Sequence, residues 1–203
     1  DLSVKAQYHS YEVMNQHVSF LFTSLLTDDC IARGKALLDG GVRYLGGTNE
    51  TYGNINTSDS LWVIRDLVFN QKKYTLRQLN DAMLANFNGY EALRKDCLNC
   101  DKYGNDLETA DTMANDLYEF VAKGVRDRGI AIGMQYFLIV ISNNQLNTEW
   151  GNRTAASPDG RLSCMYMNPA NNPQGGANKS GPTAMLNSLA KFDAKYHGGS
   201  VQN

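Results

Sequence analysis

The chain has 203 residues, of which 42% are hydrophobic, and a formal net charge of −2 at neutral pH. That length and composition suffice to bury a normal core, as one domain or two small ones. The balance of 19 basic against 21 acidic residues lacks the basic surplus of nucleic-acid and anionic-membrane binders. No apolar run reaches the about 18 residues of a membrane span, so we expect neither a nucleic-acid partner nor a membrane segment.

The N-terminal part, from Val4 to about Arg33, has a helical pattern that ends near Gly34. Its apolar positions are spaced by threes and fours, which predicts one buried helix face. These positions are Val13, Met14, Val18, Leu21, Phe22, Leu25 and Leu26. Asp1 enters the pattern directly, without a leader, so we expect a boundary cut from a longer chain and no secretion signal.

A short strand is predicted between the glycine pairs Gly40-Gly41 and Gly46-Gly47. This glycine-rich stretch has neither a G-x-G-x-x-G pattern nor a Gly-Lys-Ser/Thr ending, so it is not interpreted as a phosphate cradle. A helix follows from about Ser58 to Asn70, with Thr57 or Ser58 as its cap. Its apolar stripe consists of Leu61, Ile64, Leu67 and Val68.

Three further helices are predicted between residues 75 and 126. Thr75 and Gln78 form a capping box for the first, which Gly89 ends, and the second runs from Tyr90 to about Asn99. Asp106 is placed to cap the third. Its inward positions are Ala110, Met113, Ala114, Leu117, Tyr118 and Val121. The acidic run from 101 to 116 is interpreted as a solvated helix cap rather than a cation site, because carboxylates at a helix N-terminus favour the dipole.

The four cysteines do not form a disulfide framework or a metal set. Cys97 and Cys100 form a C-x-x-C pair in a predicted helix, without a second pair and with only three histidines in the chain. A structural zinc ion takes four ligands, and a redox pair belongs in a βαβ context that this region lacks. We expect free thiols and no metal. Four Asn-x-Ser/Thr triplets are interpreted as chance matches to the glycosylation pattern.

A nine-residue apolar run, Met134–Ser142, predicts a strand covered on both faces, as in a parallel sheet or closed barrel. A long loop follows, Gly151–Asp193, which we expect to be ordered. Ser157-Pro158-Asp159-Gly160 is a turn sequence, and Arg161 can fix it through its planar set of donors. A helix begins near Gly181-Pro182. Its apolar positions are Met185, Leu186, Leu189 and Phe192.

Several short sequence motifs together match one superfamily. Ala156–Arg161 reads A-S-P-D-G-R and Gly181–Ser188 reads G-P-T-A-M-L-N-S. Further matching phrases are D-D-C-I-A-R-G at 28–34, G-G-V-R-Y at 40–44, D-S-L at 59–61, N-F-N-G-Y-E at 86–91 and K-Y-G-N-D at 102–106. On these motifs the chain resembles the glycyl radical enzymes, the pyruvate formate-lyase-like superfamily, and is nearer to the glycerol, choline and diol dehydratase-lyase branch. The resemblance covers essentially the whole chain, but only the middle portion of the family's length.

The resemblance implies an α/β fold: residues 1–203 would be the central part of a ten-stranded α/β barrel, helix-rich and with few strands. Residues 1–130 would be mainly helical. Residues 131–203 would supply a strand, a long ordered loop, a helix and the start of another strand, which the last residues resemble.

The resemblance also implies radical chemistry. In the family, a glycine in R-V-S/A-G-Y holds a radical installed by a radical SAM activating enzyme, and a cysteine, usually in G-C-x-E, relays it to the substrate. Neither motif occurs in this sequence. We therefore expect the chain to be inactive alone, to hold no catalytic residue and to bind no cofactor. Its parent would be a cytoplasmic, homodimeric lyase or dehydratase that cleaves C–C, C–O or C–N bonds of a small organic substrate. The alternative is a standalone scaffold or decayed paralogue that acts through protein–protein association.

In related dehydratases, residues on the strand before the A-S/T-P-D-G-R turn face the substrate. Strand alternation gives two candidate faces, unless both sets are core packing: Tyr136, Leu138, Val140 and Ser142, or Phe137, Ile139 and Ile141. The remaining motif residues are interpreted as structural: Asp59, Pro158, Asp159, Gly160, Arg161, Gly181 and Pro182. Asp159 and Arg161 could instead be a catalytic acid and an anion clamp, but the family retains this turn whatever the substrate, which favours a turn-stabilising pair.

Overall fold

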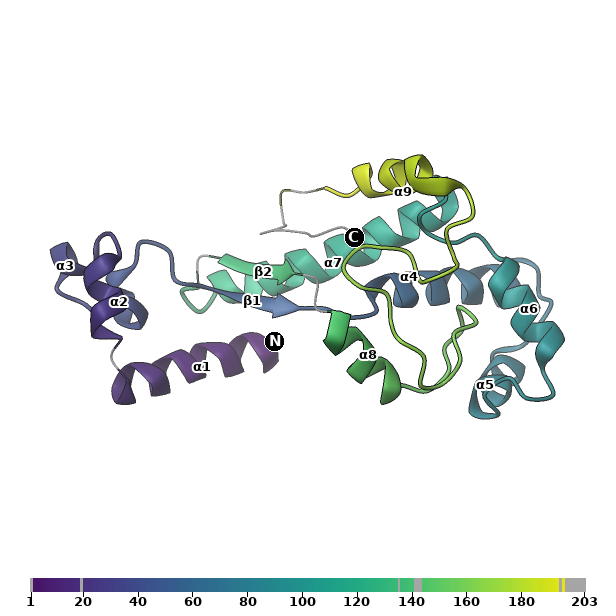
Figure 1. The fold of residues 1–203 in the computed structure, drawn as a ribbon, viewed down its shortest axis with the longest axis horizontal. Helices are drawn as coiled ribbons and strands as arrows, with labels where there is room; N and C mark the ends of the chain where they lie inside the picture. The colour runs from purple at the N-terminus through teal and green to yellow at the C-terminus, as the bar shows by residue number, and fades with distance from the viewer. Residues whose placement is uncertain (1, 19, 135, 141–143, 194, 196–203) are drawn as a thin grey trace. The chain divides into compact units, whose positions relative to one another are not determined.

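The computed structural model describes residues 2–18, 20–134, 136–140, 144–193 and 195. The side chains of 136–140 and 144 lie outside this description. The chain divides into two compact units. The first contains the described residues up to 50 and those between 121 and 139. The second contains residues 51–120 and the described residues between 140 and 195, and the long helix α7, Glu108–Ile130, belongs to both units (Figure 1).

The first unit consists of short helices and a two-stranded sheet. In chain order its elements are α1 (Leu2–His17), α2 (Leu21–Leu26), α3 (Cys30–Arg33), the kinked turn η1 (Leu37–Gly41), β1 (Gly46–Glu50), the end of α7 and β2 (Tyr136–Val140). Strand β1 pairs with β2. The small core centres on Val4 and Met134. The Tyr11 hydroxyl donates to the carbonyl of Gly46 at 2.9 Å, which joins α1 to the start of β1.

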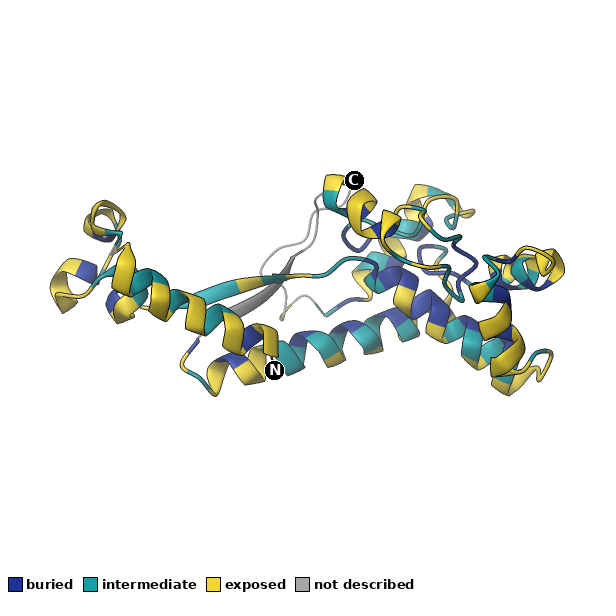
Figure 2. Ribbon diagram, turned by 90° about the horizontal axis from the view of Figure 1, so that it is seen from below, coloured by how far each residue is buried: buried dark blue, intermediate teal, exposed yellow. Residues whose placement is uncertain are grey.

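The single buried helix face predicted for residues 4–33 is wrong. The chain forms three helices there, because Phe20 (φ 43°) and Asp29 (φ 72°) adopt left-handed conformations that interrupt the helical register. The apolar side chains expected inside are largely outside, and Val18, Leu21, Phe22, Leu25 and Leu26 are 57% to 75% exposed. Figure 2 shows α1, next to the N mark, mainly in the colours of exposed and intermediate residues.

The first strand begins later than predicted, at Gly46 instead of between the two glycine pairs. Gly40 turns the chain with a φ of 82°. The Arg33 guanidinium donates to the carbonyls of Gly40 and Val42, at 3.4 and 3.1 Å. Because the Arg33 side chain already satisfies these carbonyls, they are not available for a β-ladder. The strand that pairs with β2 begins only after them, at Gly46.

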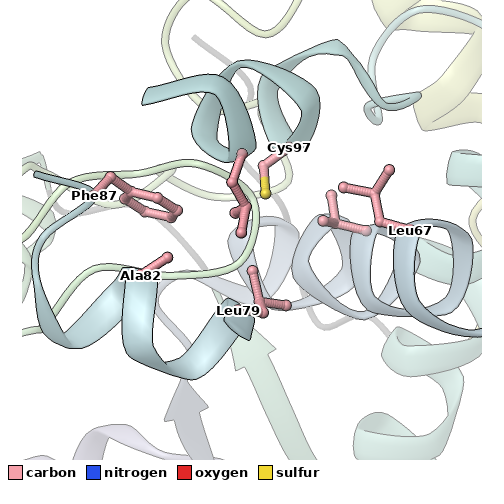
Figure 3. Close-up of a cluster of buried hydrophobic side chains, with 7 residues drawn as sticks. Leu67, Leu79, Ala82, Phe87 and Cys97 are labelled. Carbon is pink, nitrogen blue, oxygen red and sulfur yellow. The ribbon is translucent and has the colours of Figure 1, made fainter. Parts of the chain in front are cut away.

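The second unit is helical and contains the main hydrophobic cluster. Its elements are α4 (Asn54–Val63), η2 (Ile64–Asn70), α5 (Leu76–Leu84), α6 (Glu91–Asn99), the start of α7, α8 (Asn144–Asn152) and α9 (Gly181–Ala190). The buried cluster is drawn in Figure 3 and consists of Val63, Leu67, Leu79, Ala82, Phe87, Leu93 and Cys97. The predicted capping box is confirmed, since the Thr75 hydroxyl accepts from the backbone N–H of Gln78 and the Gln78 side chain accepts from that of Thr75.

Two predicted helix starts are wrong. Helix α4 begins at Asn54, directly after Gly53 with φ 71°, and not at Ser58. The hydroxyls of Thr57 and Ser58 donate back to the carbonyls of Gly53 and Ile55 instead of capping N–H groups. Asp106 does not cap α7, because its carboxylate accepts from Asn187 and forms an ion pair with Lys191 at 3.0 Å.

Two helices also differ in their details. Helix α8 was not predicted, and in α9 the buried side chains are Ala184 and Ser188, whereas Leu186 is 56% exposed. None of the helices in the described ranges is both long and apolar enough to cross a membrane.

Candidate functional site

The predicted strand before the long loop is confirmed as β2 over Tyr136–Val140. The candidate substrate-facing residues Tyr136, Leu138 and Val140, and the alternative pair Phe137 and Ile139, therefore lie on a strand. Their side chains, and the whole of Ile141 and Ser142, which complete the two predicted faces, are outside the described part of the structure. The choice between the two faces remains a prediction.

The S-P-D-G-R turn is closed by its own side chains. The Gly160 N–H donates to the carbonyl of Ser157 at 3.0 Å, and Gly160 has the positive φ, 93°, that glycine tolerates. One carboxylate oxygen of Asp159 accepts from the Ser157 hydroxyl at 2.6 Å and from the Arg161 N–H at 3.2 Å. Pro158 lies between these contacts and is half-buried. The carboxylate thus works as the internal acceptor of the turn.

The Arg161 side chain is buried and donates to the surrounding loop. Its guanidinium contacts the Ser157 hydroxyl and the carbonyls of Ala155, Leu162 and Met165. Burial lowers the pKa of Arg161, and nearby Asp159 opposes that shift. With these donors directed at the chain's own oxygens, Arg161 holds the turn and has little left to clamp a substrate anion.

Helix α4 fixes this turn from the other side through polar contacts. The Asn56 amide donates to the second carboxylate oxygen of Asp159 at 2.7 Å, and the Asp159 N–H donates to the Ser60 hydroxyl at 3.2 Å. Asn56 also exchanges hydrogen bonds with Asn168, and Asn54 donates to Asn171 at 2.9 Å. Partners of this kind are required because buried polar groups without hydrogen bonds are costly.

Asp59 is the buried acid of α4, with a 1% exposed side chain. One carboxylate oxygen accepts from the Tyr103 N–H at 3.0 Å, and within the described residues the other has no hydrogen-bond partner. Burial raises the pKa of Asp59 to about 7; the Tyr103 N–H and Lys102 oppose this shift, while Asp159 and Asp111 add to it. The Lys102 ammonium donates to the carbonyls of Cys97 and Cys100. Asp59 therefore joins α4 to the K-Y-G-N-D turn and binds a proton near neutral pH.

The G-P-T-A phrase starts α9 and is held by two asparagines. The Gly181 N–H donates to the Asn178 side chain at 2.9 Å, and Pro182 occupies the first turn. The Asn105 side chain accepts from the N–H groups of Lys179 and Ser180, at 2.7 and 3.1 Å. Residues 153–180, between α8 and α9, form an ordered segment without helix or strand that is called the connector below. Asparagine side chains hold the end of this connector in place of secondary structure.

The acidic run before α7 is not a purely solvated cap. Asp111 has no exposed side-chain area and pairs with Lys191 at 2.7 Å, while Glu108 pairs with the same lysine at 3.4 Å. Lys191 directly follows α9, so these ion pairs connect the end of that helix to the first turn of α7. The acidic residues there join two helices.

Cys97 lies in α6 and Cys100 directly follows the last residue of that helix, Asn99. Cys97 is buried and Cys100 half-buried, and both are free thiols. Burial raises the pKa of Cys97 to about 12 and that of Cys100 to about 11, so both remain protonated. The part of the chain that the structure describes brings no three His, Cys, Asp or Glu side chains together in a metal-binding group.

A cavity of about 220 Å³ lies within the second unit, between α6, the residues around Asp59 and the connector. Charged side chains from three regions line it. They are Asp59, Arg94, Lys102, Asp159, Arg161 and Lys179.

The comparisons with known proteins agree with these motifs. A profile described as "Pyruvate formate lyase-like" matches residues 1–146. The chain is 31% identical to trans-4-hydroxy-L-proline dehydratase of Clostridioides difficile over 204 aligned positions, which cover 100% of this chain and 26% of that enzyme. The chain belongs to the pyruvate formate lyase-like family and so to the glycyl radical enzyme superfamily.

Solved structures of this superfamily share the arrangement. A glycyl radical enzyme from Archaeoglobus fulgidus superposes with a TM-score of 0.89 at 28% identity, covering 98% of this chain and 25% of that one. The B12-independent glycerol dehydratase from Clostridium butyricum, with glycerol bound, gives 0.85 at 30% identity, covering 90% and 23%. The chain therefore spans about a quarter of the length of the relatives it matches. Its helix-rich fold, in which the described residues form the short strands β1 and β2, matches part of these enzymes.

Sequence reasoning missed the asparagine network. Two of the triplets interpreted as chance glycosylation matches begin at Asn56 and Asn178, and both side chains hold the connector. The available signal was the density of asparagine on both sides of the A-S-P-D-G-R turn, in N-I-N-T and N-P-A-N-N-P.

Proposed function

We propose that the chain is the central part of a glycyl radical lyase or dehydratase, where it forms part of the wall of a ten-stranded barrel. The observation that supports this most directly is the family match over residues 1–146 together with coverage of about a quarter of the relatives. The residues 1–203 would supply the strands β1 and β2, their covering helices and the ordered connector. The turn with Asp159 and Arg161 would fix the end of the substrate-facing strand.

The substrate would be a small organic molecule that loses a group by C–O, C–N or C–C cleavage. The relatives named above include dehydratases of trans-4-hydroxy-L-proline and of glycerol. Side chains of β2 would contact the substrate, either Tyr136, Leu138 and Val140 or Phe137 and Ile139. The radical would be installed by a radical SAM activating enzyme, and the whole protein would be a cytoplasmic homodimer. The motifs G-C-x-E and R-V-S/A-G-Y, absent from this sequence, would lie in other parts of the whole protein.

The test begins with the gene on both sides of the coding region. We expect G-C-x-E upstream and R-V-S/A-G-Y downstream. The longer protein, produced anaerobically with an activating enzyme, should give a glycyl radical signal in electron paramagnetic resonance, whereas the 203-residue chain should give none. Stop codons immediately outside the region, or a longer protein without either motif, would contradict the proposal.

A second candidate is a non-catalytic scaffold that acts through association. The observation in its favour is the apolar surface of α2, where Leu21, Phe22, Leu25 and Leu26 are 61% to 75% exposed. Sedimentation of the 203-residue chain distinguishes the two. A discrete, reversible oligomer with a cooperative melt supports the scaffold, and polydisperse aggregation counts against it.

A further inference from the structure

The cavity between α6 and the connector is too small for a drug-sized ligand. Its volume of about 220 Å³ lies below the about 300–1,000 Å³ of ordinary ligand pockets. A molecule of only a few non-hydrogen atoms fits it. Part of the lining is apolar and consists of Leu98, Met165 and Ala177. A suitable ligand therefore has a short apolar part.

Several cationic groups around the cavity have donors that the described chain leaves unused. The Arg94 Nε donates to the Gly160 carbonyl at 2.9 Å, and its two terminal nitrogens have no partner among the described residues. Lys179 is exposed, and in the same described set its ammonium forms neither a hydrogen bond nor an ion pair. The buried Lys102 ammonium donates to two carbonyls and retains a third N–H. These groups favour an anion.

The acidic residues of the lining do not cancel this preference. Both carboxylate oxygens of Asp159 are engaged, one by Ser157 and Arg161 and the other by Asn56. Arg161 is likewise engaged by the loop. Asp59 remains, with one buried oxygen that has no partner in the described part of the chain. An unpaired buried oxygen of this kind is costly unless it carries a proton or meets a donor.

We propose that this cavity binds a small organic carboxylate such as acetate or propionate. The Arg94 guanidinium and the Lys179 ammonium hold the carboxylate, and the methyl or ethyl group lies against Leu98 and Met165. Arginine suits this role because its planar fork matches a carboxylate with two parallel hydrogen bonds. This inference does not rest on the radical chemistry, since none of the residues that would hold the carboxylate is among the candidate substrate contacts on β2.

The protonation of Asp59 should make carboxylate binding at this site depend on pH. Lys102 and the Tyr103 N–H stabilise its charged form, whereas Asp111, Asp159 and a bound anion disfavour it. A carboxylate in the cavity thus favours the protonated form of Asp59, so that binding takes up a proton. The affinity should fall several-fold between pH 6 and pH 8.

The test is titration of the 203-residue chain with sodium acetate and sodium propionate at constant ionic strength, followed by calorimetry or NMR shifts. Acetamide and propionamide serve as neutral isosteres. Arg94→Gln and Lys179→Gln should each weaken carboxylate binding by about tenfold. Lys95→Gln, a neighbouring exposed cation of α6 that does not line the cavity, should leave binding unchanged.

Three results would overturn the proposal: no carboxylate binding, equal binding of the amides, or equal loss in Lys95→Gln and Lys179→Gln. Lys179→Gln is the variant least prone to misfolding, because this side chain is exposed and its ammonium has no hydrogen bond or ion pair with the described residues. Circular dichroism of each variant verifies that the helices are retained.

Discussion

Asn56 on α4 and Asn168 in the connector each donate a backbone N–H to the side-chain oxygen of the other. The two N···O distances are 3.1 and 2.8 Å, and both residues are buried. The Asn168 amide donates onward to the carbonyl of Ala170 at 2.9 Å. An asparagine side chain has an acceptor and two donors, so one pair satisfies several backbone groups at once. This exchange explains how a long segment without a strand or a helix is held in one conformation.

The Asn56–Asn168 exchange should show strong energetic coupling. Asn56→Ala or Asn168→Ala leaves a buried N–H without an acceptor and should lower the free energy of unfolding by about 2–3 kcal/mol each. The double variant should lose less than the sum, with about 1–2 kcal/mol of coupling, because the first change already breaks the exchange. Urea unfolding monitored by circular dichroism gives these values.

The control for this cycle is Asn80→Ala in α5. Asn80 is exposed, so its replacement should change the free energy of unfolding by less than about 0.5 kcal/mol. Fully additive losses at Asn56 and Asn168 would show that the two residues stabilise the fold separately.

Asp59 should make stability fall as the pH rises. Its pKa increases from the ordinary 3.8 to about 7 on folding, so the native state binds this proton more tightly than the unfolded state. The resulting stabilisation is fully present below pH 4 and is lost between about pH 4 and pH 7, with an amplitude on the order of 4 kcal/mol. Denaturant midpoints measured across this range should therefore decrease.

Asp59→Asn should abolish most of this slope, because the amide keeps an oxygen for the Tyr103 N–H and has no proton to lose. The exposed Asp81→Asn in α5 is the matched control and should retain it. Asp96 and Asp106 have lowered pKa values in the folded chain, so their contribution to stability is lost as the pH falls. That loss occurs below pH 4 and does not overlap the titration of Asp59. A wild-type chain equally stable at pH 4.5 and pH 7.5 would rule out the buried proton.

The capping box of α5 offers a local test. Thr75→Ala removes the acceptor of the Gln78 N–H, at 3.1 Å, and should cost about 1 kcal/mol. Thr75→Ser keeps the hydroxyl and should retain most of the stability. Urea unfolding of the two variants distinguishes the contribution of the capping hydroxyl from that of the threonine methyl group. If both variants lose the same free energy of unfolding, the effect belongs to the methyl group.

The features predicted most accurately from the sequence are those that a few neighbouring residues determine. The capping box at Thr75 and the strand at Tyr136–Val140 depend on a few adjacent side chains, and each lies where its pattern places it. The turn at Ser157–Arg161 belongs in part to the same class, since the Gly160 N–H donates to the Ser157 carbonyl and the Arg161 N–H to the Asp159 carboxylate, all within five residues. The predicted helix end at Gly89 is wrong, because α5 already ends at Leu84 and Asn86 and Phe87 adopt positive φ.

Long-range partners were beyond such reasoning. The spacing of Leu21, Phe22 and Leu25 predicts an apolar face, but it does not state whether a partner surface covers it. Likewise, the pairing of Asn56 with Asn168 spans 112 residues and has no local signature. The raised pKa of Asp59 follows from burial, which only the packing of α4 reveals.

Arg161→Lys should loosen the connector although it conserves the charge. The guanidinium reaches the carbonyls of Leu162 and Met165, at 3.2 and 2.8 Å, from one planar group, and an ammonium cannot reproduce this geometry. We expect a loss of about 2–4 kcal/mol and faster thermolysin cleavage near Leu162, because local opening exposes the segment. Arg153→Lys, at an exposed position of the same connector, should cleave at the wild-type rate. If Arg161→Lys resisted thermolysin as well as the wild type, the turn would depend on Asp159 and its contacts with α4 and not on the guanidinium.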